Sequence, residues 1–365
     1  MKKIFVAVCV LVFFNLFSQT ALAYSDENAE SIAEQAGADG IKSEYLNEEE
    51  LSGDRNINVF EKAFDIVVDA FKDNGISVVK SFGAVLAVIL LNCVMSAMKF
   101  GGSEVIDTAC GYISVLALSG VTYSVLYNLF VFVIASMEAL TIAMSSLSSI
   151  MASLYVFGGT SATGAAGSGG LTLFFSVLSI ICTKVLLPLL QISFALCLVG
   201  AVPASVNLSA VTSLVKNAAT TLMAFIFTLL GFTLYLQTAV ASASDTYVTR
   251  SIKFASGVFV PVIGNMLGDA ARTVISSVSI VKGTVGAAGV VIVFSAVLPS
   301  IIAVVLNKLL LLGCGIIAKS LGCERESTFL YDLLGVTNVL LALVMGAGVI
   351  CIIALAVFIK SGVTV

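Results

Sequence analysis

The stretch Val336–Ile359 reads VTNVLLALVMGAGVICIIALAVFI, and Lys360 follows it directly. None of these 24 residues is Asp, Glu, Lys or Arg. A helix that crosses the hydrocarbon core of a bilayer needs about 20 mainly apolar residues. The stretch therefore predicts a membrane-spanning helix, and it points to an all-α fold.

The composition of the whole chain agrees with this prediction. Of its 365 residues, 59% are hydrophobic and 11% are charged, whereas soluble domains carry about 25% charged residues. So few charges cannot cover a soluble surface, which excludes a soluble enzyme. The chain contains no His, which excludes Ser-His-Asp catalysis and HExxH zinc sites. No GxxxxGK sequence is present, so the chain has no P-loop for ATP.

Five further apolar stretches are long enough to cross a bilayer, which gives a base count of six spans. Each is bounded by charged or polar residues. The five are Ser77–Met98, Ala109–Ser136, Leu171–Pro203, Ala218–Val240 and Gly289–Leu312, the last of which contains Pro299.

The region after the second stretch leaves a seventh span open. Met137–Phe157 holds one charge, Glu138, together with six Ser or Thr residues. It is either an interfacial helix or a further span. The glycine-rich stretch Gly158–Gly170 that follows predicts a flexible loop.

A lysine interrupts the third apolar stretch. Lys184 separates the apolar runs Leu171–Thr183 and Val185–Val202. A charge at the bilayer centre costs about 2.5–3.5 kcal/mol on insertion scales, so we expect Lys184 at a helix break. The region is then either a re-entrant half-helix followed by a full span, or one long helix kinked at Pro188.

The N-terminus has the anatomy of a secretory signal peptide. Lys2 and Lys3 precede an apolar run, and Ala21-Leu22-Ala23 forms a cleavage site before Tyr24. Residues 1–23 are therefore predicted to be a signal peptide, and the chain after it to begin outside the cytoplasm. The basic residues of the later loops show no clear bias to either side of the membrane.

An acidic extracytoplasmic segment is predicted at 24–76, before the membrane domain at 77–365. Residues 24–75 carry 14 acidic and 4 basic side chains. An amphipathic helix is expected near its end, because apolar residues recur there at helical spacing. Its apolar face, with Phe64, Val67 and Phe71, either packs on the chain's own membrane domain or docks a partner.

The eight cysteines predict packing rather than chemistry. No CxxC pair occurs, and most cysteines lie inside apolar runs, where they act as small hydrophobic residues. A disulfide between Cys314 and Cys323 would require an oxidising compartment. No metal site, catalytic residue or cofactor is predicted.

The polar stretch Ser251–Gly289 is too polar for a span and too apolar for an ordinary loop. Gly264 and Gly268 form a small-xxx-small pair, which allows close approach of helices. Asp269 and Arg272 are spaced to pair on one helix. The stretch is either a pair of interfacial helices or a re-entrant element that lines a polar path. Together with two charges in the apolar stretches, it supplies the candidate assembly or pore-lining residues: Glu138, Lys184, Lys253, Pro261, Gly264, Gly268, Asp269, Arg272 and Lys282.

The chain resembles the stage III sporulation protein AE family of endospore-forming bacteria. The resemblance covers most of the mature chain and is sharpest in this polar stretch, at Lys253-Phe254, Pro261-Val262-Ile263-Gly264, Asp269-Ala270, Lys282, Gly286 and Gly289. It implies a non-enzymatic membrane subunit of a channel or secretion-like complex that joins the mother cell to the forespore.

The resemblance also implies partners and a location. The partners are subunits of the same sporulation operon: a cytoplasmic ATPase, small membrane subunits and ring proteins between the two membranes. The expected location is the mother-cell membrane around the forespore. Nucleic acid is not an expected partner, and homo-oligomers stay open. The alternative is a secondary transporter that acts alone, for which broken helices in matching positions would be expected.

Overall fold

The computed structural model describes residues 59–97, 104–157, 161–201, 209–259 and 264–361. Within these helices it does not describe the side chains of 60, 95–97, 104–112, 151, 154–157, 161–168, 200–201, 209, 234, 237–284 and 358–361. The described elements are nearly all helical, as the sequence predicts. They are α5 (Val59–Ala97), α6 (Glu104–Phe157), α7 (Ser161–Ile181), the π-helical turn η2 (Cys182–Leu186), α8 (Leu187–Ala201), α9 (Ser209–Phe259), α10 (Gly264–Ser320) and α11 (Glu324–Ser361).

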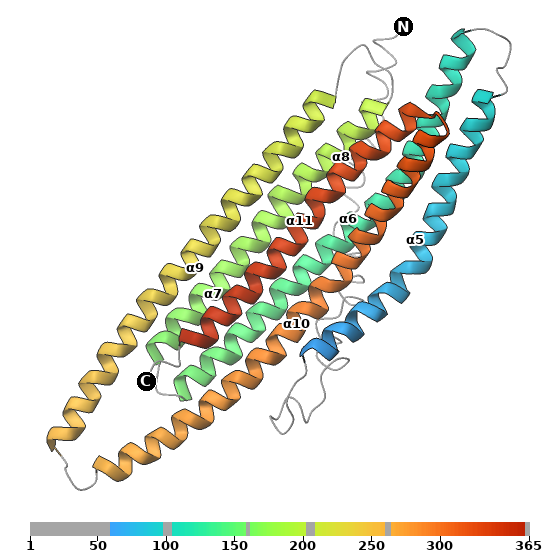
Figure 1. The fold of residues 1–365 in the computed structure, drawn as a ribbon. Helices are drawn as coiled ribbons and strands as arrows, with labels where there is room; N and C mark the ends of the chain where they lie inside the picture. Colours follow the sequence, from blue (N-terminus) through green and yellow to red (C-terminus); the bar gives the residue numbers. More distant parts are fainter. Residues whose placement is uncertain (1–58, 98–103, 158–160, 202–208, 260–263, 362–365) are drawn as a thin grey trace, which may run out of the picture.

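The helices run roughly side by side along one elongated bundle (Figure 1). Among the described residues, six helices are long and apolar enough to cross a membrane, with α7, η2 and α8 acting as one. This matches the six stretches predicted from sequence and is compatible with a membrane protein. The apolar regions are Glu61–Val94, Ile113–Ile150, Gly169–Val199, Ala210–Thr233, Val285–Ser320 and Glu324–Val357.

The core lies where α10 and α11 pack on one another and on α6. Val293, Val304, Leu333, Leu340 and Leu343 are completely buried there. Helices α5 and α9 lie at opposite edges of the bundle (Figure 1). Only 17% of the apolar region of each is buried, against 39–56% in the other four. The two edge helices therefore leave most of their apolar surface uncovered.

The stretch Met137–Phe157 is neither a separate interfacial helix nor a seventh span, and both predictions are wrong. It forms the second half of α6, a single helix of 54 residues. Its hydroxyls do not interrupt the helix, because they bond to carbonyls of the preceding turn. Thr141 Oγ1 donates to Met137 O at 2.8 Å, and Ser149 Oγ donates to Ser145 O at 3.2 Å.

The predicted flexible loop at Gly158–Gly170 is also wrong over its described part, because α7 begins at Ser161. The helix then continues without a gap to Ala201. Packing outweighs the low helix propensity of glycine here: Leu171, Phe174 and Phe175 of the same helix are buried in the core. The alternative of one long helix is therefore right, and the re-entrant half-helix is wrong.

The irregularity in this long helix is the π-turn η2, which contains Lys184. The Leu187 N–H donates to Cys182 O, five residues back, where an α-helix would bond four residues back. Pro188 follows directly, and a proline ring clashes with the carbonyl four residues before it. The wider turn lies where this clash would fall, at Lys184.

The polar stretch Ser251–Gly289 also differs from both predictions. Its described residues extend α9 to Phe259 and begin α10 at Gly264, so it is neither re-entrant nor a separate pair of interfacial helices. The two helices reach beyond the ends of the others at one end of the bundle (Figure 1). Helix α10 has 57 residues, about 85 Å at 1.5 Å per residue, well over the roughly 30 Å of a bilayer core.

The amphipathic helix predicted before the first span is continuous with that span as α5. Its core-facing residues are Ile66 and Ala70, which are 1% and 5% exposed. Phe64 and Phe71 are instead 67% and 57% exposed, so their predicted packing on the chain's own membrane domain is wrong. The predicted helical spacing is correct, but a different side of the helix packs against α10 and α6.

Candidate functional site: polar contacts between the helices

The turn between α10 and α11 is fixed by its backbone. Gly322 has a φ of 77°, which glycine adopts without a steric penalty. The Gly322 N–H donates to Lys319 O at 3.1 Å, and the Cys323 N–H donates to Ala318 O at 2.9 Å. This pair of bonds is the Schellman motif that ends many helices. It turns the chain so tightly that α11 returns directly along α10.

A buried polar cluster joins this turn to the end of α5. Glu326 is only 3% exposed, and its Oε1 accepts a hydrogen bond from Asn92 Nδ2 at 2.5 Å. The same amide lies 3.9 Å from Cys323 Sγ. Cys93 Sγ donates to Leu321 O at 3.9 Å. We call Asn92, Cys93, Cys323 and Glu326 the turn cluster. It attaches an edge helix to the centre of the bundle.

Ionisation of the Cys323 thiol is unfavourable in its surroundings. Burial raises the pKa of Cys323 above its ordinary value, and the Glu326 carboxylate raises it further. A thiol with a raised pKa is a poor nucleophile at neutral pH. Cys314 and Cys323 are both free thiols, so the structure has no disulfide between them.

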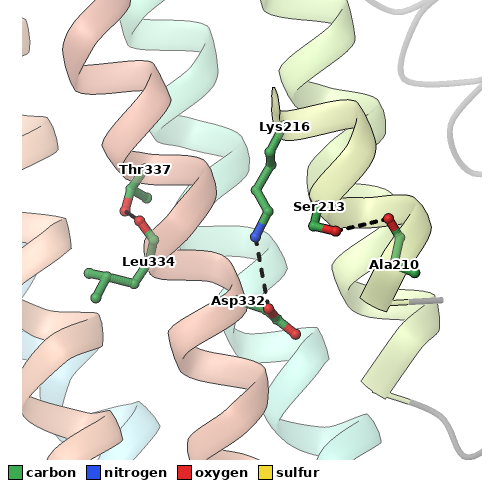
Figure 2. Close-up of polar contacts among 6 residues, drawn as sticks. All are labelled: Ala210, Ser213, Lys216, Asp332, Leu334 and Thr337. Atoms are coloured by element: carbon green, nitrogen blue, oxygen red, sulfur yellow. Dashed lines mark hydrogen bonds and ion pairs between the residues drawn. The ribbon is translucent and has the colours of Figure 1, made fainter. Parts of the chain in front are cut away.

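An ion pair joins α9 to α11 near the same end of the bundle. Lys216 Nζ lies 3.8 Å from Asp332 Oδ1, and the two side chains are 17% and 39% exposed (Figure 2). The hydroxyls of Ser213 and Thr337 nearby bond only within their own helices. A Cβ at Gly335 would lie 2.8 Å from Lys216 Nζ, so this glycine makes room for the lysine.

We expect Asp332→Asn to destabilise the bundle by about 1 kcal/mol, because it leaves the mostly buried Lys216 without its counter-charge. The thermal unfolding midpoint of the purified protein in detergent should fall. Asp69→Asn is the matched control, since Asp69 pairs with Lys72 at 3.3 Å on an exposed surface. An equal fall in both variants would show that the α9–α11 pair has no special role.

Lys184 and Glu138 are the two predicted site residues whose side chains the structure describes. Lys184 lies at a helix irregularity, as predicted, but the irregularity is a π-turn rather than a break. Its side chain is exposed, and Glu138 on α6 is half-buried. Among the described residues, neither has an ion-pair partner.

The other predicted site residues lie outside the described side chains. Lys253 is on α9, and Pro261 falls in 260–263, which the structure does not describe. The backbone places the remaining five on the first turns of α10 and beyond: Gly264, Gly268, Asp269, Arg272 and Lys282.

The sequence analysis did not pick out Asn92, Lys216, Glu326 and Asp332. Each lies within about three turns of a helix end, where single polar residues are common. A usable signal was present, since buried polar residues in membrane helices usually face other helices rather than lipid. The partner of each residue depends on tertiary packing, which spacing along the chain does not give.

Close helix contacts depend on two glycines of α11. A Cβ at Gly346 would collide with Phe227 Cε2 on α9, and one at Gly348 would lie 3.0 Å from Val297 Cγ1 on α10. Small residues that let helices approach are typical of membrane helix packing. In the described part of the chain, no cluster of three or more His, Cys, Asp or Glu residues could hold a metal ion.

In the described residues, six long apolar helices pack through glycines and buried polar pairs, an arrangement compatible with an α-helical membrane protein. The family model of the stage III sporulation protein AE matches residues 42–362, and the chain belongs to that family.

A relative in Bacillus subtilis (strain 168), described as "Stage III sporulation protein AE", is 33% identical over 109 residues. That alignment covers 30% of this chain and 27% of the relative. No solved structure matches the chain.

Proposed function

We propose that this chain is a non-enzymatic membrane subunit of a sporulation-specific channel or secretion-like complex. The complex would link the mother cell and the forespore during and after engulfment. The observation that carries the proposal is that one sporulation family model extends over residues 42–362, the part of the chain that contains all six apolar helices. The proposed location is the mother-cell membrane around the forespore.

The proposed topology begins with a signal peptide at 1–23 and an extracytoplasmic acidic segment at 24–76, followed by six crossings. An even number of crossings is supported by the bundle, since the start of α5 and the end of α11 point to the same end (Figure 1). The turn cluster would then face the cytoplasm. N-terminal sequencing of membrane-extracted protein tests the leader, and a mature chain that begins at Met1 would overturn it.

The proposed partners are the operon's cytoplasmic ATPase, its small membrane subunits and the ring proteins between the membranes. The extensions of α9 and α10 beyond the apolar regions support contact with partners outside the bilayer, because they have no function in spanning it. We therefore propose that Lys253, Pro261, Gly264, Gly268, Asp269, Arg272 and Lys282 act in assembly.

The test uses a tagged chain in sporulating cells that lack their own copy. We expect the parent to restore spores and to co-purify a ring protein from between the membranes, the side on which the proposed topology places the α9–α10 extension. Gly264→Leu should reach the membrane but lose the partners and at least about tenfold of the spore yield, because a bulky residue replaces a small one at a close-contact motif. Gly120→Leu is the control, since no atom lies within 4 Å of a Cβ built there. Normal partner binding and sporulation by Gly264→Leu would overturn the assembly role.

A further inference from the structure

Two opposite charges lie within the apolar regions of neighbouring helices, and no described residue forms an ion pair with either. Lys184 lies in the middle of Gly169–Val199, and Glu138 lies inside Ile113–Ile150. An isolated charge in hydrocarbon is unfavourable, and such residues in membrane proteins usually pair or face a polar path. Among the described residues, neither charge has an ion-pair partner. Within the part of the chain that the structure describes, both charges are therefore open to pairing with a partner.

The two charges lie at the same level of the bundle. Helices α6 and α7 pack side by side in opposite directions. One small cavity is lined by Met137 and Thr141 of α6 together with Ser179 and Cys182 of the α7–η2 segment. Glu138 lies between the first two residues, and Lys184 follows Cys182 by two positions. The charges are thus neighbours in depth.

The two charges also face the same side of the molecule. An open groove between α6 and α7 is lined by Ser149 and Leu173. Ser149 lies about three helical turns from Glu138 and shares its face of α6. Leu173 begins a row of exposed residues on α7 that continues through Val177 and Ile180 to Lys184. The groove therefore lies on the face of α6 that carries Glu138 and on the face of α7 whose exposed residues lead to Lys184.

We propose that two copies of this chain dock through this α6–α7 face, with Lys184 of each copy paired to Glu138 of the partner subunit. A two-fold axis along the bundle places the same face of both copies together, so every contact occurs twice. A face that carries one positive and one negative charge at equal depth is complementary to itself under this rotation. The proposal rests on the membrane location proposed above.

A second copy pairs both charges on this face, whereas lipid or a single foreign helix does not. Lipid chains would leave both charges in hydrocarbon. A foreign helix that carried one acidic residue would satisfy Lys184 and leave Glu138 unpaired. The exposed apolar residues of the row, such as Val177 and Ile180, supply the packing surface between the charge pairs.

The test mixes two charge reversals of the full chain, each with a different tag, in one membrane. Glu138→Lys copies should not co-purify with each other, and neither should Lys184→Glu copies, because like charges then meet. We expect a loss of at least about tenfold against the parent. A mixture of the two variants should co-purify like the parent, since every contact between unlike copies again joins opposite charges. Pairing of Glu138 and Lys184 within one chain would not produce this recovery.

Two neutral variants and a cysteine cross-link test the proposal even if a charge-reversal variant does not accumulate in the membrane. Glu138→Gln and Lys184→Gln should each weaken co-purification. In a background without native cysteines, Ile180→Cys copies should cross-link to each other in native vesicles, whereas Ile353→Cys copies on α11 should not. Both positions are exposed, at 57% and 47%.

Two results would overturn the proposal. One is parent copies that never co-purify, and the other is a mixture of reversals that does no better than either variant alone. Capture of a different membrane protein that depends on Lys184 alone would favour the foreign helix instead. Separation of the parent into the soluble fraction would overturn the membrane location itself, a result distinct from failure of the pairing.

Discussion

Replacing Gly346 with leucine is expected to destabilise the packed bundle strongly. A Cβ at this position would already collide with Phe227 Cε2, and leucine adds three further carbons. Extra atoms in a packed core cost about 1–3 kcal/mol, and occasionally more. We expect a lower thermal unfolding midpoint in detergent and less protein in the membrane, because α9 can no longer approach α11.

The control is Gly231→Leu on α9, where no atom lies within 4 Å of an added Cβ. A second variant identifies the colliding side chain. Shortening Phe227 to alanine in the Gly346→Ala background should recover part of the lost stability, since the ring then no longer occupies the space of the new Cβ. Parent-like stability of Gly346→Leu would show that α9 and α11 do not meet at this glycine.

Replacing Asn92 with alanine should release α5 from the α10–α11 turn. The change removes the donor to Glu326, a carboxylate that is 3% exposed. Hydrogen bonds to charged groups contribute about 1.5–3 kcal/mol, and the stranded charge adds to the loss. We expect a fall in stability of about that size. Asn74→Ala is the matched control, because Asn74 bonds only to Ala70 O of its own helix.

The reactivity of Cys323 gives a local readout of the same change. Burial and the Glu326 carboxylate hold the pKa of this thiol above its ordinary value, so it should react slowly with maleimide near neutral pH. Asn92→Ala removes an amide contact that lowers this pKa, but burial is the larger cause, so opening of the turn cluster should still expose the thiol and speed labelling. Glu326→Gln should also speed labelling, since it removes the nearby negative charge. Unchanged labelling in both variants would contradict the turn cluster.

The apolar helices could be predicted from sequence because hydropathy reports them directly. Stretches such as Val336–Ile359 and Ala218–Val240 lack charges over the length of a bilayer, and no tertiary contact is needed to recognise them. Hydropathy does not predict that these helices continue beyond their apolar parts. In Met137–Phe157, the hydroxyls look like a polar boundary, although within the helix each can bond to the preceding turn.

The polar contacts were harder to predict for a different reason. Lys184 and Glu138 stood out as rare charges in apolar surroundings, and the structure places both on the α6–α7 face. The pair of Lys216 with Asp332 joins residues more than 100 positions apart in the sequence. A single sequence contains no information on which distant helices become neighbours, so such pairs follow only from the packed bundle.

The π-turn at Cys182–Leu186 has a consequence for how the gene can change in length. Its hydrogen-bonded loop encloses one residue more than an α-helical turn does. Removal of one residue from an ordinary part of this long helix would rotate everything beyond it by about 100°, and would turn Leu190 and Phe194 out of the core. Removal of one residue inside the π-turn would instead keep the same faces inward, although Pro188 would then clash with the carbonyl four residues before it. A one-codon deletion at the segment around Lys184, or the insertion that it reverses, therefore preserves the buried and exposed faces along the rest of the helix.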